Sequence, residues 1–292
     1  MDRQRGVYFI ANDFILDRAI AFLNSFRRYN TSIPLCLIPY ADDIDRLAAL
    51  RDRYDFDIWA DSELLDTCDE ISRTFHGVAR TERKYRKLAT WEGAFDEFAY
   101  FDCDTVVLHD VSFVFRYLDQ YAFITGYANS PGTRHLVWED SIYETGALTE
   151  EQIAYAAGTG FVASRKEHLP FAEVQRRLPA AQKLAPHMYL ETCDQPLLNY
   201  LMVTSGLPYT SLNIAAAANG ASDVAVERWG GLPIGEIRDG AVVSPESPPT
   251  LFVHWAGLWY RNGTDLARIP GADLSDLPNY ELWRYYRDQP VG

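Results

Sequence analysis

Phe98-Ala-Tyr-Phe101, Asp102-Cys-Asp104 and Thr105-Val-Val-Leu108 follow one another without a break, so that an apolar stretch ends in an acidic triplet and a second apolar stretch begins. The first stretch predicts a buried strand, and open α/β sheets bind ligands beyond the carboxyl ends of their strands. If the backbone stays extended, both carboxylates project to one side, about 6.5 Å apart. Such a pair can bind one divalent cation, and without a cation it would repel itself. The segment therefore predicts a metal site at the edge of a sheet.

Two further Asp-x-Asp triplets, Asp43-Ile-Asp45 and Asp55-Phe-Asp57, occur earlier in the chain. Both lie among charged residues, and we interpret them as a solvated helix face and a turn. The position of the third triplet at the end of an apolar strand, and not the pattern alone, distinguishes it.

Strand and helix patterns alternate from the N-terminus onwards. Strands are predicted over 7–11, 33–40 and 56–59, and helices over 15–30 and 42–54. In the first helix the apolar residues recur with a helical period at Ile15, Ala19, Phe22, Leu23 and Phe26. This alternation is typical of an α/β fold with a mostly parallel sheet.

Later segments continue the pattern less regularly. A helix is predicted over 81–97, a loop over 129–149, a strand over 160–164, a helix over 195–203 and a strand over 251–255. Asp239-Gly240 predicts a two-residue hairpin turn. No repeat or linker interrupts the chain, which predicts a single domain.

The composition excludes several classes of protein. The chain has 27 Lys and Arg against 41 Asp and Glu, a net charge of −14, which argues against binding to nucleic acid. With 48% hydrophobic residues it is expected to be globular. No window reaches the roughly 20 apolar residues that span a bilayer, so we expect no transmembrane segment. Four cysteines without a Cys-x-x-Cys pair are unlike a disulfide scaffold or a zinc site, and a cytoplasmic location is expected.

His254 ends the apolar run Thr250-Leu-Phe-Val-His254, three residues before Gly257. A histidine in such a place is more often structural. Together with Asp102 and Asp104, however, it would form a set of two carboxylates and one imidazole, which suits Mn²⁺ better than Ca²⁺. Mg²⁺ is the alternative ion.

These residues occur with other segments whose order resembles that of the GT-A glycosyltransferases, and among them the retaining glycosyltransferase family 8. The further matching segments are 9–26, Tyr85-Arg-Lys-Leu88, Gly158-Thr-Gly-Phe-Val-Ala-Ser164, Asp194-Gln-Pro-Leu-Leu-Asn199 and His254-Trp-Ala-Gly257. The resemblance implies one Rossmann-like domain over 1–292, with a nucleotide-binding half over 1–128 and a half over 129–292 that binds the sugar and the acceptor. It also implies transfer of a hexose from UDP-glucose or UDP-galactose, with retention, to a glycan, a lipid-linked acceptor or a small molecule.

The same resemblance implies a role for each matching residue in the donor site. The metal ligands would be Asp102, Asp104 and His254. The residues that contact the nucleotide-sugar would be Ala11 and Asn12 at the base and ribose, Lys87, Cys103, and Gly257 beside the diphosphate.

Two positions depart from the family pattern, both in the second half of the chain. The family's Lys-Pro-Trp after the final glycine is here Tyr260-Arg-Asn262, which leaves Arg261 as a substitute for the phosphate-contacting lysine. The asparagine of the family's Asn-x-Gly is replaced by Ala156 or Gly158. By the same resemblance, Asp194 and Gln195 would face the transferred sugar.

Other interpretations stay open at this stage. Asp102-Cys-Asp104-Thr-Val106 also matches the first motif of haloacid-dehalogenase-type phosphatases, although Asp273 and Asp276, the best later acidic pair, do not follow a strand. A non-catalytic module that binds sugar nucleotides is a further alternative. Asp194 stands just before a predicted helix, and for this residue the alternative is an N-cap with no other role.

Aromatic residues gather near the C-terminus and could stack on a sugar ring. We interpret them as core residues, as is more common for such clusters. They are Trp255, Trp259, Tyr260, Trp283, Tyr285 and Tyr286.

Overall fold

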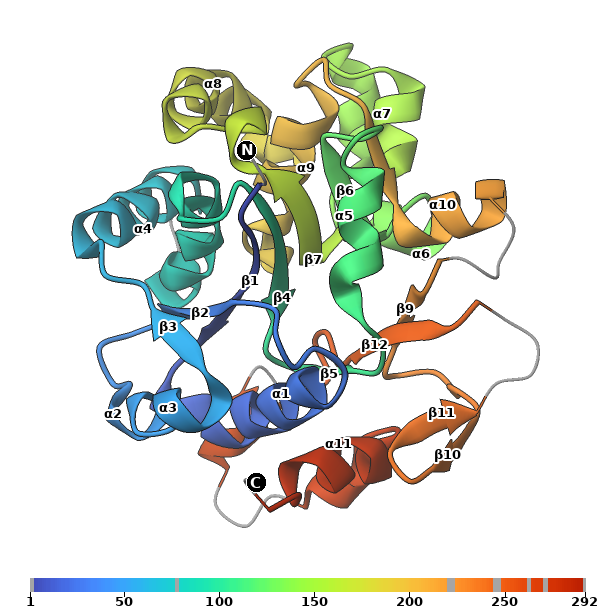
Figure 1. Ribbon diagram of the computed structural model, residues 1–292. Helices are drawn as coiled ribbons and strands as arrows, with labels where there is room; N and C mark the ends of the chain where they lie inside the picture. The colour runs from blue at the N-terminus through green and yellow to red at the C-terminus, as the bar shows by residue number, and fades with distance from the viewer. Residues whose placement is uncertain are drawn as a thin grey trace.

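The computed structural model describes residues 3–76, 79–219, 224–243, 248–261, 264–269 and 273–290. Its centre is a seven-stranded sheet in the order β3-β2-β1-β4-β7-β6-β8 (Figure 1). The strands are β1 (Arg5–Ala11), β2 (Leu35–Pro39), β3 (Phe56–Ile58), β4 (Glu97–Asp102), β6 (Phe123–Tyr127), β7 (Gly158–Arg165) and β8 (Tyr209–Ser211). Within this sheet β7 runs antiparallel to both neighbours, and the other strands are parallel. The predicted α/β fold with a mostly parallel sheet is confirmed.

Helices cover both faces of this sheet, because its central strands are apolar on both sides. In β1, Val7 and Phe9 pack in one core cluster, whereas Tyr8 and Ile10 pack in a second. The first cluster includes residues of α1 (Leu16–Tyr29), α5 (Val114–Tyr117) and α10 (Leu212–Asn219). The second includes residues of α4 (Ser62–His76), the 3₁₀ helix η2 (Ala79–Glu92), α8 (Phe171–Leu184) and α9 (Gln195–Val203).

Three predicted segments differ from the structure. The helix predicted over 42–54 is two short helices, α2 (Asp45–Ala48) and α3 (Arg51–Tyr54), and the Asp13 carboxylate caps α2 by accepting from the backbone N–H of Arg46 and Leu47. The helix predicted over 81–97 ends at Glu92, since Glu97 already pairs with Arg5 in the sheet. The loop predicted over 129–149 contains α6 (Pro131–Arg134), which begins with a capping box at Ser130, and η4 (Asp140–Thr145).

Short elements connect the larger ones. They are η1 (Asp13–Ile15), η3 (Val111–Phe113), α7 (Glu150–Tyr155), η5 (Lys166–His168), η6 (Ala185–His187), η7 (Leu190–Thr192), η8 (Leu266–Arg268) and η9 (Leu274–Asp276). The predicted hairpin is confirmed as β10 (Glu236–Arg238) and β11 (Ala241–Val243), with Asp239 and Gly240 both at positive φ. Among the described residues, no helix has both the length and the apolar character needed to cross a bilayer.

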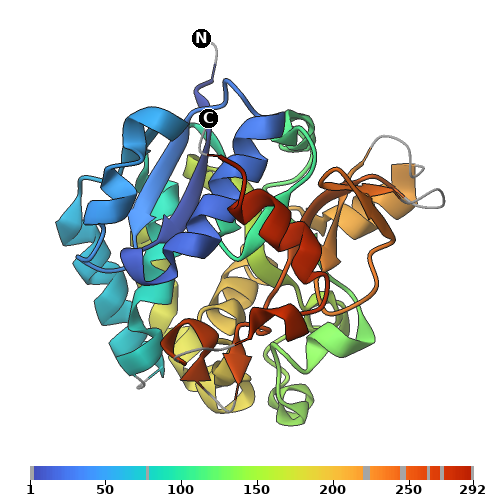
Figure 2. The ribbon, with the colours of Figure 1, turned by 90° about the horizontal axis from the view of Figure 1, so that it is seen from below.

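A second, three-stranded sheet lies beside the first. It consists of β5 (Thr105–Val107), β12 (Thr250–His254) and β9 (Val226–Trp229), with β12 in the centre, antiparallel to β5 and parallel to β9. The ribbon β13 (Tyr260–Arg261) and β14 (Thr264–Asp265) follows β12, and α11 (Tyr280–Arg287) packs against α1 (Figures 1 and 2).

The late aromatic residues divide between core and surface. Trp255, Trp259, Trp283 and Tyr286 are buried in a core cluster between the small sheet and α11, which confirms the core interpretation for these four. Tyr260 is 49% exposed and Tyr285 is partly buried.

Candidate metal centre and its surroundings

The acidic triplet lies where the chain passes from the large sheet to the small one. Asp102 is the last residue of β4, Cys103 and Asp104 form a bend, and Thr105 begins β5. The Thr105 hydroxyl donates to the carbonyl oxygen of Asp102 at 2.8 Å and closes this bend. The backbone is therefore not extended through the triplet, and the condition on which the 6.5 Å spacing depended is not met. The bend nevertheless leaves both carboxylates on the same side of the molecule, near His254.

The register of the small sheet brings His254 to the triplet from 150 residues away. His254 pairs with Thr105 across β12 and β5, and the backbone N–H of Trp255 donates to the carbonyl oxygen of Asp104 at 3.0 Å. The His254 Nε2 atom consequently lies 3.2 Å from Asp104 Oδ1. One ligand atom from each of Asp102, Asp104 and His254 lies within 4.8 Å of the others, and we refer to these three residues as the Asp–Asp–His cluster.

The charged groups in this cluster shift one another's pKa values. Burial disfavours the ionised form of Asp104, yet the adjacent His254, with Arg18 and Lys84, holds its pKa at about 2. Burial also disfavours a charged His254, but Asp104 and Glu227 raise the pKa of this imidazole well above its usual value. A region that draws a proton onto its histidine in this way would exchange that proton for a divalent cation. Two carboxylates and an imidazole nitrogen fit Mn²⁺, with Mg²⁺ as the harder alternative.

Lys87 connects the cluster to the start of α9. Its Nζ atom lies 2.8 Å from Asp194 Oδ2 and 3.4 Å from Asp102 Oδ1, and it donates to the carbonyl oxygen of Thr159 at 3.2 Å. Burial acts to lower the pKa of Lys87, whereas the two carboxylates raise it above its ordinary value. This lysine is therefore a buried cation that holds two acidic residues in place.

Asp194 is more than a helix cap. It stands directly before α9, but its side chain makes no capping hydrogen bond to the helix. Its carboxylate instead faces Lys87 and accepts from the Thr159 hydroxyl at 3.3 Å. The sequence alternative of a simple N-cap is therefore wrong.

The backbone before Asp194 is strained. Cys193 has a φ of 66°, a value that residues other than glycine rarely adopt and that costs roughly 1–3 kcal/mol. The Tyr85 hydroxyl donates to the carbonyl oxygen of Cys193 at 2.9 Å and helps to hold this conformation. Next to Asp194, Gln195 donates its Nε2 to the carbonyl oxygen of Leu136 at 3.0 Å, which fixes the orientation of its amide.

Lys84 is a residue at this site that the sequence did not identify. It is partly buried, and although burial acts to lower its pKa, the nearby Cys193, Tyr260, Asp194 and Asp102 raise it above its ordinary value. It stands immediately before the Tyr85-Arg-Lys-Leu88 motif, and this position is the sequence signal that could have found it.

Ala11, Asn12 and Cys103 lie beside the cluster. Ile10 pairs with Asp102 in the large sheet, so the chain leaves β1 through Ala11 and Asn12 at the same edge. Asn12 donates to the carboxylate of Asp43 at 3.1 Å, and Cys103 is buried within the bend.

Gly257 and Arg261 follow β12. Gly257 has a φ of 75°, and nothing lies within 4 Å of the place where a Cβ would be. Arg261 lies on the exposed β13–β14 ribbon, and its guanidinium pairs with Asp276 at 3.4 Å.

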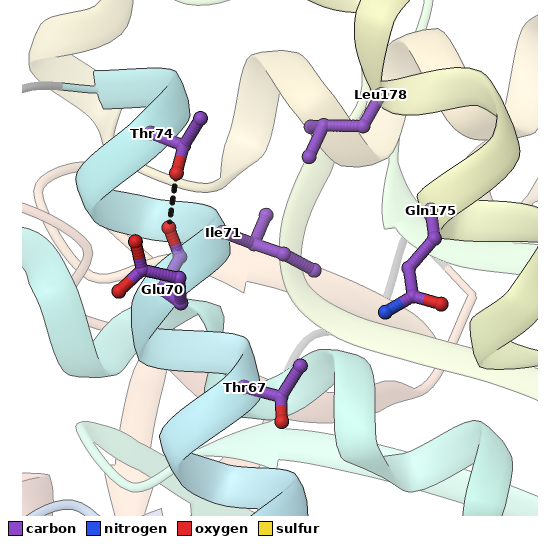
Figure 3. A pocket seen from close by; sticks show the side chains of 6 residues that line it. All are labelled: Thr67, Glu70, Ile71, Thr74, Gln175 and Leu178. Atoms are coloured by element: carbon purple, nitrogen blue, oxygen red, sulfur yellow. Dashed lines mark hydrogen bonds between the residues drawn. The ribbon is translucent and has the colours of Figure 1, made fainter.

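A groove between α4 and α8, of about 240 Å³, lies elsewhere (Figure 3). Its lining residues are Thr67, Glu70, Ile71, Thr74, Gln175 and Leu178, none of which belongs to the cluster. Its acidic residue, Glu70, already pairs with Arg73 at 2.7 Å. The groove therefore offers no set of converging charged groups.

Solved structures of other proteins are similar to this chain in fold. No protein-family model matches the sequence, and no curated protein matches it. The bifunctional glycosyltransferase WbbM in its apo form is similar with a TM-score of 0.58 at 11% identity, over 99% of this chain and 50% of that one. GlyE of Streptococcus pneumoniae TIGR4 has a TM-score of 0.53 at 16% identity, over 98% and 62%.

The galactosyltransferase LgtC, in complex with donor and acceptor sugar analogues, has a TM-score of 0.54 at 13% identity, over 96% of this chain and 95% of that one. The chain thus spans about half of WbbM and 62% of GlyE, but nearly all of LgtC. At these identities the likeness concerns the fold alone. The chain has the GT-A fold of the glycosyltransferases.

Proposed function

We propose that this protein is a metal-dependent glycosyltransferase that moves a hexose from a nucleotide-sugar, UDP-glucose or UDP-galactose, to an acceptor. The observation that carries the proposal is the Asp–Asp–His cluster at the carboxyl edge of the central sheet, in a chain with a GT-A fold. Open α/β sheets bind ligands at this edge. The similar LgtC structure holds donor and acceptor sugar analogues, which supports the same class of substrate.

In this proposal the cluster holds Mn²⁺, or Mg²⁺, which when bound would orient the diphosphate and stabilise it as a leaving group. Lys84 adds a partly buried cation near the Asp–Asp–His cluster, whereas Lys87 already pairs with the carboxylates of Asp102 and Asp194. We therefore assign a diphosphate contact to Lys84 in preference to Arg261, whose guanidinium pairs with Asp276.

The other donor contacts follow the edge of the sheet. Ala11, Asn12 and Cys103 would border the base and ribose. Gly257, whose open surroundings leave its backbone accessible, would lie beside the diphosphate. The first half of the chain, 1–128, would thus supply most nucleotide contacts, and the half over 129–292 would supply those to the sugar and acceptor.

Asp194 and Gln195 are assigned to the transferred sugar, with retention of configuration. The Gln195 amide is oriented by its donation to Leu136, so its oxygen is the end that can face the sugar. A structure of LgtC is described as an active-site mutant in which a glutamine is changed to glutamate. An amide oxygen stabilises the positive charge that develops at the anomeric carbon but is a poor nucleophile.

The step that fits these groups takes place on one face of the sugar. The bond between the anomeric carbon and the diphosphate oxygen breaks, and the acceptor oxygen forms its bond to the same carbon from that face. The proton of the acceptor hydroxyl passes to the leaving diphosphate oxygen. Asp194, buried against Lys87 and Thr159, would position the sugar.

A phosphatase is not favoured by the structure. The later acidic pair considered for it has other partners: Asp276 pairs with Arg261 at 3.4 Å, and the Asp273 carboxylate accepts from the backbone N–H of Ser275 at 2.9 Å. The similar solved structures reported above are glycosyltransferases.

The test uses Asp104→Asn, which removes a charged ligand while nearly preserving shape. UDP release from UDP-glucose and UDP-galactose with Mn²⁺ should fall by orders of magnitude, while the protein stays folded without metal. Asp45→Asn, an exposed position in another Asp-x-Asp triplet, is the matched control and should retain activity. Wild-type turnover by Asp104→Asn in metal-free buffer would refute the site.

Ligand specificity is read separately by thermal shift. A ligand that binds only the native state adds about 2.7 kcal/mol at a hundredfold excess over Kd. UDP with Mn²⁺ should stabilise the protein more than either alone, and more than ADP or GDP with Mn²⁺. Stabilisation without turnover in a single-turnover assay would favour a binding module, and phosphate release from simple monoesters would favour the phosphatase.

A further inference from the structure

Glu227 lies behind His254, on the side opposite Asp104. Its Oε1 atom is 2.9 Å from His254 Nδ1, while His254 Nε2 faces Asp104 at 3.2 Å. A neutral imidazole carries its proton on one ring nitrogen, and the hydrogen bond made by that nitrogen decides which one it is. A carboxylate can only accept, and without a metal both ring nitrogens of His254 face carboxylates, Nδ1 towards Glu227 and Nε2 towards Asp104. Where a cation takes the place of the proton on Nε2, Glu227 would keep the remaining proton on Nδ1, and the Nε2 lone pair would be directed at the Asp–Asp–His cluster.

The fold builds this pair from two adjacent strands. Glu227 on β9 is in register with Phe252 on β12, and His254 stands two residues further along the same face of β12. The Glu227 side chain is only 11% exposed. A carboxylate this buried is costly unless it has a partner, and His254 supplies one.

Two glycines of the large sheet leave room for the pair. A Cβ on Gly160, in β7, would lie 2.1 Å from His254 Cε1. A Cβ on Gly126, in β6, would lie 2.0 Å from Glu227 Oε2. Both side chains are thus enclosed by backbone of the neighbouring sheet, which limits the orientations they can adopt.

We propose that Glu227 is a positioning residue for the metal, which fixes the tautomer and orientation of His254 so that Nε2 faces the ion. This inference rests on the metal site of the proposed function and adds a residue outside the ligand set. Carboxylates that accept from a metal-bound histidine also make it a stronger ligand, and their loss typically weakens metal binding 10- to 100-fold.

The test measures Mn²⁺ binding directly, by electron paramagnetic resonance of the free ion, and requires no catalysis. Glu227→Gln and Glu227→Ala should each bind Mn²⁺ about 10- to 100-fold more weakly than the wild type. Glu236→Gln, which removes an exposed charge on β10, is the control and should bind as the wild type does. Wild-type affinity in both Glu227 variants overturns the proposal.

A double-mutant cycle separates positioning from simple attraction of charge. In a His254→Ala background, Glu227→Gln should have no further effect on Mn²⁺ affinity, because the residue through which it acts is gone. An undiminished loss in that background means that Glu227 acts on the ion by its charge, and it overturns the proposal. If Glu227→Ala does not fold, the isosteric Glu227→Gln carries the same comparison.

The tautomer gives a second measurement. In Mg²⁺-loaded protein with ¹⁵N-labelled histidine, the wild-type His254 should carry its proton on Nδ1, and a proton on Nε2 contradicts the proposal. Failure here can be told apart from failure of the proposed function. Mn²⁺ binding that depends on Glu227, in a protein without glycosyl transfer, rejects the function but keeps the inference, whereas a wild-type protein that binds no Mn²⁺ rejects both.

Discussion

Lys87→Met tests how the buried ion pair beside the metal centre is held together. The Lys87 and Asp194 side chains are 5% and 6% exposed, with Nζ and Oδ2 2.8 Å apart. Removing one partner of a buried pair leaves the other charge uncompensated, which costs about 3–5 kcal/mol. Methionine preserves most of the volume, so a cavity adds little. We therefore expect the free energy of unfolding to fall by about 3–5 kcal/mol at pH 8.

The loss should depend on pH, with a sign that the structure sets. Burial raises the pKa of Asp194 above its ordinary value even though Lys87 opposes this, and without Lys87 the pKa should rise further. A carboxyl whose pKa is raised in the folded state binds more protons folded than unfolded. Stability then decreases as pH rises from about 4 towards the folded pKa. The deficit of Lys87→Met should accordingly be smaller at pH 5 than at pH 8.

Urea unfolding in EDTA measures these differences without metal. Lys166→Met is the matched control, because Lys166 pairs with Asp96 at 2.6 Å on the surface, where the two side chains are 43% and 38% exposed. That pair should contribute less than about 1 kcal/mol. The double variant Lys87→Met with Asp194→Asn should lose much less than the sum of the two single variants. Equal losses in Lys87→Met and Lys166→Met, or a deficit independent of pH, would refute the reasoning.

Glu97 should carry part of the stability towards acid, because burial raises its pKa but hydrogen bonds from three arginines outweigh burial and leave the pKa below its ordinary value. Its contribution to stability is present above about pH 4.3 and is lost as pH falls through the folded pKa. In Glu97→Gln the urea unfolding midpoint should therefore decrease less steeply as pH falls below about 4.3, and the same decrease as in the wild type would contradict this. Gly160→Ala would put a Cβ 2.1 Å from the imidazole of His254 and should weaken Mn²⁺ binding measured by calorimetry. Gly158→Ala, whose Cβ would have its nearest atom 3.9 Å away, should bind Mn²⁺ as the wild type does, and equal affinities of the two variants would argue against the steric reasoning. Trp283→Ala removes a side chain that is 1% exposed and should cost about 3–5 kcal/mol in urea unfolding, while Trp229→Ala, 45% exposed, should cost less than about 1 kcal/mol, and similar costs would exclude a core role for Trp283.

The elements that the sequence predicted well depend on local properties of the chain. The strand at the N-terminus, the helix over 195–203 and the turn at Asp239-Gly240 all follow from side-chain periodicity or from residues that tolerate positive φ. Asp102 and Asp104 could also be singled out, because they are close in sequence and follow an apolar strand. The same local reasoning assumed an extended backbone through the acidic triplet, whereas the chain bends there and enters a second sheet.

The partners of these residues were decided by tertiary structure alone. His254 reaches Asp104 through the register of β12 on β5, and Lys87 meets Asp194 only because η2 and α9 pack on the same face of the large sheet. Glu227 stands in the short strand Val226-Glu-Arg-Trp229, which has no motif around it, and its contact with His254 depends on strand pairing and on space left by two glycines. The sequence by itself determined the strands and turns around Asp102, Asp104 and His254 and made these three residues candidates, because strand, turn and motif patterns are local. The partner of each buried charge was decided by long-range packing. A buried charge pairs with a group of opposite charge within about 3–4 Å, and only the tertiary structure brings such groups together.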